Sequence, residues 1–256
     1  MRKYLLLTVM LLSCANSVDE TFDYGLEAKL IGFSPMYSAF DGKHTYALTP
    51  NVPSAAQTSK DADPVLASSI RWEVDDAFVK REEFPDLPAA IKLTTKKPGM
   101  TTVRVKVKTL SGLAVRSEAK LTISKATESE WEAGDRRYNE GSMNPELDRE
   151  SQPECGLVQH ITLPKQGSCS NCHDSASNTI ANDLTPTQTA GYSNEDLIDI
   201  ATQAAKRPDV DFTSPFLRNA PMPDCLYKAF HTWMMTDEEK QGIVWKIRSI
   251  APKVAP

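Results

Sequence analysis

The chain has 256 residues, a length that allows one large domain or two ordinary ones. Its 29 Lys and Arg residues against 34 Asp and Glu residues leave a net charge of −5, which argues against a nucleic-acid-binding protein. Hydrophobic residues make up 40% of the chain and charged residues 25%, so disorder throughout is not expected. Only one apolar run is present, at the N-terminus, and this excludes a multi-span membrane protein.

The N-terminus has the pattern of an export signal. Arg2 and Lys3 precede a short apolar run at residues 4–12, and polar sequence follows. Residues 11–14, with the sequence LLSC, resemble the lipobox of bacterial lipoproteins. This resemblance implies that the thiol of Cys14 carries lipid. A plain signal peptide with an incidental cysteine is the alternative interpretation.

The lipoprotein resemblance also implies a location. Residues 1–13 would be removed as a signal peptide, and residues 14–25 would form a tether to the membrane. Several acyl chains on one residue give a stable anchor. We expect an exported, membrane-anchored protein that faces the periplasm or the cell surface. Ala15 after the cysteine favours the outer membrane, as in the enterobacterial pattern.

Hydrophobic and polar residues alternate through residues 68–124, which predicts β-strands with one buried face. Turn sequences at 97–99 and 110–112 separate the alternating runs. This layout resembles the immunoglobulin-like modules of exported bacterial proteins, on the basis of Trp72, the Pro98-Gly99 turn and two closing strands. The resemblance implies an all-β immunoglobulin-like sandwich over residues 26–125, with a role as a spacer or docking surface.

Three capping boxes predict helices in the second half of the chain. In each box, a Thr or Ser precedes an acidic residue by three positions, and the boxes begin at Thr127, Ser193 and Thr236. Apolar residues follow each box at helical spacing. The first of these helices contains Gly134 and Tyr138. A glycine inside a helix costs about 1 kcal/mol relative to alanine, so Gly134 is expected to have a packing role.

Residues 169–173 carry the most specific motif, Cys-Ser-Asn-Cys-His. C-x-x-C-H is the signature of covalent haem attachment. The Cys169 and Cys172 thiols can reach the two vinyl groups of one haem edge, and His173 can supply an axial imidazole to the iron. A zinc site would need two more ligands. A thioredoxin-like redox pair would need a βαβ context, and an incidental match is the third alternative.

The order of these features resembles that of class I cytochromes c. A capped helix with a glycine is followed by the C-x-x-C-H motif, a middle helix, a Met-Pro loop and a closing helix over residues 126–252. The resemblance implies a C-terminal domain, residues 126–256, with an all-α cytochrome c fold and one covalent haem c. It also implies that the first and last helices cross, with Gly134 allowing their close approach.

The same resemblance implies a distal iron ligand from the loop before the last helix. Met222, between two prolines, is the favoured candidate. An open site and four other residues are the alternatives: His231, Met235, Met234 and His160. In the family, a proline carbonyl accepts the other N–H of the proximal histidine, and Pro186 is the nearest candidate for that role.

Two cysteines remain after the haem motif and Cys14 are assigned. In an oxidising compartment, leftover thiols most often pair, so we expect a disulfide between Cys155 and Cys225. In the chain-entropy model, closing a loop of about 70 residues stabilises the fold by roughly 4 kcal/mol. Two separate buried thiols are the alternative.

These features predict a lipid-anchored monohaem electron carrier rather than an enzyme, because no Ser-His-Asp set or paired carboxylate cluster stands out. Its partner would be a redox protein, with a basic docking surface that complements the acidic chain. One alternative is a haem-containing accessory or sensor module of an envelope enzyme. Another is a surface scaffold or adhesion lipoprotein in which the immunoglobulin-like half carries the function.

Overall fold

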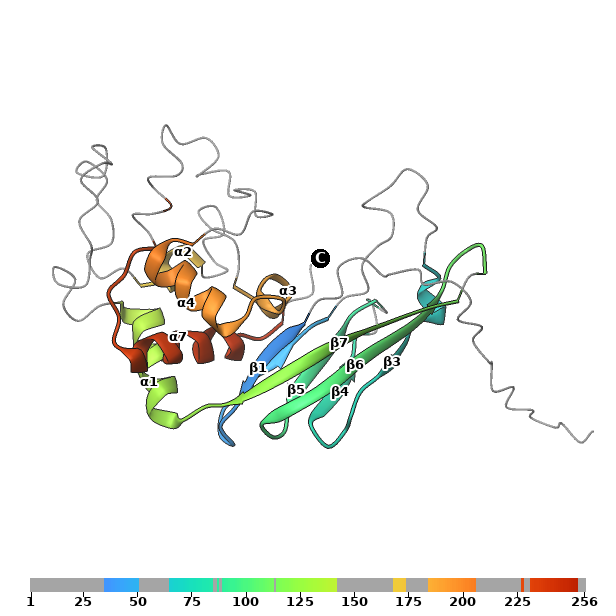
Figure 1. The fold of residues 1–256 in the computed structure, drawn as a ribbon, viewed down its shortest axis with the longest axis horizontal. Coiled ribbons are helices and arrows are strands. Elements are labelled where there is room, and N and C mark those ends of the chain that lie inside the picture. The colour runs from blue at the N-terminus through green and yellow to red at the C-terminus, as the bar shows by residue number, and fades with distance from the viewer. Residues whose placement is uncertain are drawn as a thin grey trace, which may run out of the picture.

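A computed structural model gives the structure of the chain (Figure 1). It describes residues 35–50, 65–84, 87, 89–112, 114–141, 168–173, 184–205, 227 and 231–252. The first part of this sequence forms two β-sheets, and the second part forms helices that lie against one end of the sheets (Figure 1).

The larger sheet has four strands in the order β1-β7-β6-β3. They are β1 (Met36–Phe40), β7 (Ala114–Lys125), β6 (Gly99–Lys108) and β3 (Arg71–Glu73). β6 and β7 form a long antiparallel hairpin, and β3 pairs antiparallel with β6. β1 pairs in parallel with the last part of β7, so the start of the described chain lies beside the strand that leads into the helices.

The smaller sheet has three antiparallel strands in the order β2-β5-β4. They are β2 (Ala47–Leu48), β5 (Ile91–Thr95) and β4 (Val79–Glu83). A 3-10 turn, η2 (Ala67–Ser69), precedes β3.

The two sheets enclose one hydrophobic core. Val103, Val105 and Val107 of β6 are fully buried, as are Leu93 of β5 and Val79 of β4. The residues between the three valines are only partly buried, so the alternation predicted for this strand is confirmed. Burial of each such side chain contributes about 1.5–3 kcal/mol to stability. The core between the two sheets is therefore the main source of stability in the first part of the described chain, which we call the β part.

The hairpin between β6 and β7 turns where the sequence predicted it. The N–H of Gly112 donates to the Thr109 carbonyl at 3.0 Å. The φ angle of Gly112 is +88°, a backbone conformation that glycine adopts without steric cost.

Five helices are described in the second part of the chain. They are α1 (Glu128–Glu140), α2 (Ser170–His173), α3 (Pro186–Thr189), α4 (Asn194–Gln203) and α7 (Asp237–Ser249). The three predicted capping boxes are confirmed. Thr127, Ser193 and Thr236 each accept a hydrogen bond from the N–H three residues later, and the acidic side chain at that position accepts from the N–H of the capping residue.

Helices α1 and α7 cross at two glycines. A Cβ atom placed on Gly134 of α1 would overlap the carbonyl of Gly242 in α7. A Cβ atom placed on Gly242 would in turn overlap the carbonyl of Glu130. The expected packing role of Gly134 is confirmed, and it depends on a second glycine that the sequence analysis did not identify.

Trp245 and Lys246 complete the contact between α1 and α7. The indole N–H of Trp245 donates to Glu130 Oε2 at 2.9 Å. The Lys246 ammonium lies 2.5 Å from Asp135 Oδ1 and 5.4 Å from the centre of the Trp131 ring.

The predicted fold class, in which residues 126–256 form a separate all-α cytochrome c domain, is wrong. In the described part of the chain, helices α1, α4 and α7 share one hydrophobic core with Ala39 and Tyr46 of the β part. Strand β7 ends at Lys125 and α1 begins at Glu128, so only two residues join them. With so short a connection, the helices pack on the end of the sheets instead of enclosing a core of their own.

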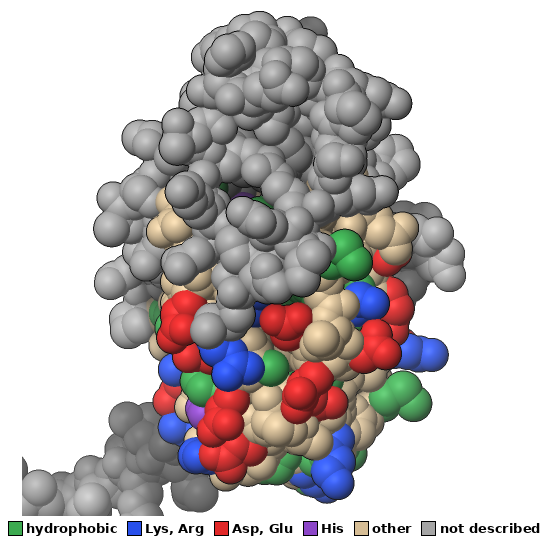
Figure 2. Space-filling model, turned by 90° about the vertical axis from the view of Figure 1, so that its left-hand side faces the viewer, with side chains coloured by type: hydrophobic (Ala, Val, Ile, Leu, Met, Phe, Trp, Pro, Cys, Tyr) green, Lys and Arg blue, Asp and Glu red, His purple; other side chains and the backbone are tan. Residues whose placement is uncertain are grey.

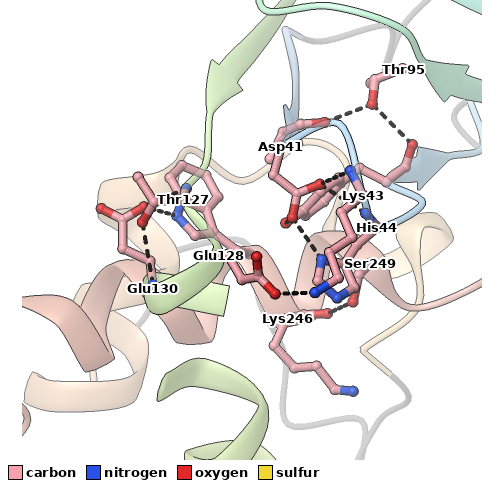
Figure 3. A network of polar contacts seen from close by, with 12 residues as sticks. Asp41, Lys43, His44, Thr95, Thr127, Glu128, Glu130, Lys246 and Ser249 are labelled. Carbon is pink, nitrogen blue, oxygen red and sulfur yellow. Dashed lines mark hydrogen bonds and ion pairs between the residues drawn. The ribbon is translucent and has the colours of Figure 1, made fainter. Parts of the chain in front are cut away.

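The loop between β1 and β2 holds the start of α1 against the sheets (Figure 3). Asp41 accepts hydrogen bonds from the backbone N–H groups of Lys43 and His44 and pairs with His44 Nδ1 at 2.7 Å. The His44 ring stacks on Trp131 of α1 at 3.6 Å, and the Lys43 ammonium pairs with Glu128.

Arg248 of α7 forms a second connection between the helices and the sheets. Its guanidinium donates to the carbonyls of Thr189 and Tyr192, at 2.9 and 2.6 Å. It also lies 5.9 Å from the ring of Tyr37 in β1. This buried side chain therefore ties the last helix both to the α3–α4 segment and to the β part.

Candidate haem-attachment site

The Cys-Ser-Asn-Cys-His motif forms one helical turn. The N–H groups of Cys172 and His173 donate to the carbonyl of Cys169, at 3.2 and 2.9 Å. Residues three and four positions apart lie on the same face of a helix, so this turn brings both thiols and the imidazole together. Neither thiol forms a disulfide. The turn thus presents two cysteine side chains and one imidazole on one side of α2.

Helix α2 lies against the end of α1. The Ser170 hydroxyl is 3.5 Å from the carbonyl of Asn139, the next-to-last residue of α1. Cys169 packs on the hydrophobic core that α1, α4 and α7 share with the β part. The motif is therefore supported by the rigid helix pair.

Burial raises the pKa of both thiols. The pKa of Cys169 rises to about 11, although the charge of Arg137 opposes the shift. Burial also raises the pKa of Cys172. Both groups are protonated at neutral pH, whereas a dithiol redox catalyst needs a thiol with a lowered pKa. These surroundings disfavour the thioredoxin-like interpretation of the motif.

A second histidine lies beside the motif. The ring centres of His231 and His173 are 6.2 Å apart, with 68° between the ring planes. Burial lowers the pKa of His231 to about 4; a hydrogen bond to the Tyr227 carbonyl opposes this shift and the proximity of His173 adds to it. His231 is therefore neutral at pH 7, which is the form of imidazole that binds metals.

Arg137 of α1 places a positive charge next to this site. Its side chain is 1% exposed, although arginine is rarely buried without a charged or polar counterpart. The guanidinium lies 5.4 Å from the ring centre of Trp233, and Nη1 lies 4.0 Å from Glu239 Oε1. No sequence motif marks Arg137 as a site residue. In the sequence, the one feature that places Arg137 near the packed face of this helix is its position three residues after Gly134.

The remaining predicted site residues are not brought into the cluster formed by Cys169, Cys172, His173 and His231, or lie outside the described residues. Pro186 begins α3, and its carbonyl accepts the N–H of Ala190 at 2.9 Å. The side chain of Met234 is 60% exposed, and Met235 is half-buried. Five of the predicted site residues lie outside the described residues: Cys14, Cys155, His160, Met222 and Cys225. The predicted lipidation, the predicted disulfide and the favoured distal ligand all involve these residues.

The described residues contain neither a cluster of metal-binding side chains nor a membrane-spanning helix. No group of three or more His, Cys, Asp or Glu side chains that suits a metal ion lies among them. Within the same ranges, no helix is long and apolar enough to cross a membrane.

The residues of α2 and its surroundings fit a covalently bound haem. Two unpaired thiols at the required spacing lie on one face of a helical turn, with an imidazole directly after the second. A second imidazole lies near the first. A covalent haem uses this donor set, whereas a tetrahedral zinc site uses four ligands around one point.

Comparisons with known proteins identify no family. No protein-family model matches the chain. No curated protein matches it either. Among solved structures, the chain is similar to the PKD domain from the KIAA 1837 protein, with 15% identity and a TM-score of 0.28 over 36% of this chain and 81% of that one. It is also similar to CopC from Methylosinus trichosporium OB3b, with 13% identity and a TM-score of 0.25 over 37% of this chain and 87% of that one.

Proposed function

We propose that this protein is an exported c-type haem protein that transfers single electrons. In this proposal the S–H group of Cys169 and that of Cys172 each add across one vinyl double bond of a single haem, which forms two thioethers with no leaving group. His173 would hold the iron. The observation that carries the proposal is the helical turn at 169–173, which presents both unpaired thiols and the imidazole on one side. When bound, the haem supplies the one-electron chemistry of its iron.

The protein's own residues support this chemistry in two ways. The crossed pair α1 and α7 gives the motif a rigid base, because Gly134 and Gly242 let the two backbones touch. The guanidinium of Arg137, buried beside the site, provides a positive charge suited to the carboxylates of a haem propionate.

The proposed partner is another redox protein with a basic surface. Figure 2 views the end of the molecule that carries the helices, and Asp and Glu side chains are spread over its described part. The first turns of α1 and α7 carry five acidic residues: Glu128, Glu130, Asp237, Glu238 and Glu239. Such a face steers a basic partner toward the helical end. Export remains part of the proposal, because haem is attached to C-x-x-C-H motifs outside the bacterial cytoplasm. A lipid anchor at Cys14 also remains part of the proposal.

The first experiment is to produce the full chain in a bacterial host that exports it and attaches c-type haem. We expect a haem stain that survives denaturing electrophoresis and a c-type pyridine haemochrome spectrum. A Cys169→Ser, Cys172→Ser double variant is expected to lose covalent haem completely. Ser170→Ala, a change in the same helical turn that leaves both thiols, is the matched control. Absence of covalent haem from the exported wild-type protein would overturn the proposal.

A further inference from the structure

His231 is held in place by its backbone. The N–H of Ala204 donates to the carbonyl of His231 at 2.8 Å, and the N–H of Trp233 lies 3.4 Å from the carbonyl of Ala201. Ala204 ends α4 in a left-handed conformation, with φ of 50° and ψ of 36°. The segment around His231 is therefore bonded to the end of α4, so its position relative to that helix is defined.

The ring of His231 is held in one orientation. Its Nδ1 lies 2.9 Å from the carbonyl of Tyr227, which can only accept a hydrogen bond. Nδ1 therefore carries the proton, and Nε2 carries the lone pair. The Tyr227 ring stacks on the imidazole at 4.4 Å, and its hydroxyl donates to the Ala205 carbonyl at 3.0 Å. A backbone carbonyl on one ring nitrogen, which leaves the other to bind, is the usual arrangement of a metal-ligating histidine.

The separation of the two histidines matches a shared metal. An imidazole–metal bond is about 2 Å long and a ring nitrogen lies about 1 Å from the ring centre, so two imidazoles on opposite sides of one metal have centres about 6 Å apart. The observed separation between His173 and His231 is 6.2 Å. The 68° between the ring planes is compatible with this geometry, because each ring can rotate about its own metal–nitrogen bond.

We propose that His231 is the distal axial ligand, so that the haem iron is held between the imidazoles of His173 and His231. This inference rests on the proposed function, and it departs from the methionine ligand favoured by the sequence. Of the two methionines near His231, Met234 is 60% exposed.

Bis-imidazole ligation has two consequences for function. Methionine as one axial ligand raises the reduction potential of a haem, so the pair of imidazoles sets a lower potential. Both axial positions are also filled by side chains on rigid supports. A haem held by both imidazoles would have no position open to a small ligand, which favours an electron carrier over a gas sensor or a catalyst.

The test uses the full-length protein with its haem attached. We expect a low-spin wild-type spectrum without the far-red band of methionine-ligated ferric haem, and ferrous protein that does not bind carbon monoxide. His231→Gly is expected to keep covalent haem by the pyridine haemochrome assay, become high-spin and bind carbon monoxide. Added imidazole is expected to restore the low-spin spectrum. Met222→Ala and Met235→Ala are the matched controls, and both are expected to keep the wild-type spectrum.

The outcomes separate the two proposals. A far-red band in the wild type that Met222→Ala or Met235→Ala abolishes would overturn the assignment of His231 and leave the haem protein intact. Should His231→Gly fail to fold, the wild-type spectrum and the methionine variants still decide the ligand. Loss of covalent haem from the wild type itself would overturn the proposed function and this inference together.

Discussion

At the scale of single residues, two glycines determine how α1 and α7 pack. Alanine is normally the better helix former, and replacing a helical glycine with alanine gains about 0.5–1 kcal/mol. At Gly134 this gain is offset by a steric cost, because the added methyl group would overlap the backbone of Gly242. The helices would have to move apart along their whole contact, since backbone atoms cannot rotate away as a side chain can.

We therefore expect Gly134→Ala to lower the free energy of unfolding by at least about 2 kcal/mol, in the range seen for overpacked cores. The measurement is denaturant unfolding of the full chain followed by far-UV circular dichroism. Arg136→Ala is the matched control, because Arg136 is exposed on the same helix. A Gly134→Ala variant as stable as this control would contradict the close helix crossing.

At the scale of elements, the loop between β1 and β2 connects the sheets to α1. Asp41 organises this loop, and its side chain is only 2% exposed. Burial acts to raise the pKa of Asp41, but the hydrogen bonds from the His44 side chain and from the N–H groups of Lys43 and His44 outweigh it, so the pKa is lowered. The hydrogen bonds between Asp41 and His44 are drawn in Figure 3. They hold the His44 ring where it stacks on Trp131, so this carboxylate is one of the groups that join the sheets to α1.

The lowered pKa of Asp41 predicts a pH dependence of stability. A carboxyl group whose folded pKa lies below its unfolded value stabilises the fold above the unfolded pKa, and this contribution is lost as the pH falls through the folded pKa. Asp41→Asn is expected to be less stable than the wild type at pH 7 by about 1.5–3 kcal/mol, the usual value of a hydrogen bond to a charged group. The difference is expected to shrink below about pH 4, near the ordinary pKa of an aspartate.

Thermal unfolding between pH 3 and pH 7 would measure this effect. Asp76→Asn, at an exposed turn, controls for the general loss of one negative charge. If the stability difference between Asp41→Asn and the wild type stayed constant across this range, the stabilising role of the Asp41 carboxylate would be wrong.

At the scale of the whole molecule, the β part and the helices behave as one structure. Ala39 and Tyr46 of the β part are fully buried within the core that contains Ile243 and Val244 of α7. Backbone hydrogen bonds also cross between the two parts, from Tyr37 N to the Ala190 carbonyl and from Ala126 N to the Phe40 carbonyl. Separating the parts would expose this apolar surface and leave buried polar groups without partners, which is costly.

We therefore expect the described core to unfold in a single transition. The chain has four tryptophans, of which only Trp72 lies in the β part. In a Trp72→Phe variant, fluorescence reports on the helical end while far-UV circular dichroism follows the strands as well. Coincident midpoints in denaturant are expected, with the wild type as the control. Two separated transitions would restore the interpretation of two independent domains.

Local signals in the sequence predicted much of the secondary structure. The capping boxes at Thr127, Ser193 and Thr236, and the alternation at Val103, Val105 and Val107, depend on neighbours within a few residues, and all of them are confirmed. The predicted fold class was wrong because it depends on contacts between distant segments. Whether a set of helices encloses its own core depends on which apolar faces meet, and no local pattern marked Ala39 or Tyr46 as partners of α7.

For the site, the sequence by itself determined the C-x-x-C-H motif, because the spacing of Cys169, Cys172 and His173 sets their common face on one helical turn. Only the tertiary structure decided what lies opposite that face. His231 follows His173 by 58 positions in the chain, and its place beside the motif comes from backbone bonds to the end of α4. Gly242 likewise acquires its role only from contact with Gly134. Interactions within one turn are encoded by spacing, whereas contacts between distant segments depend on how the elements pack.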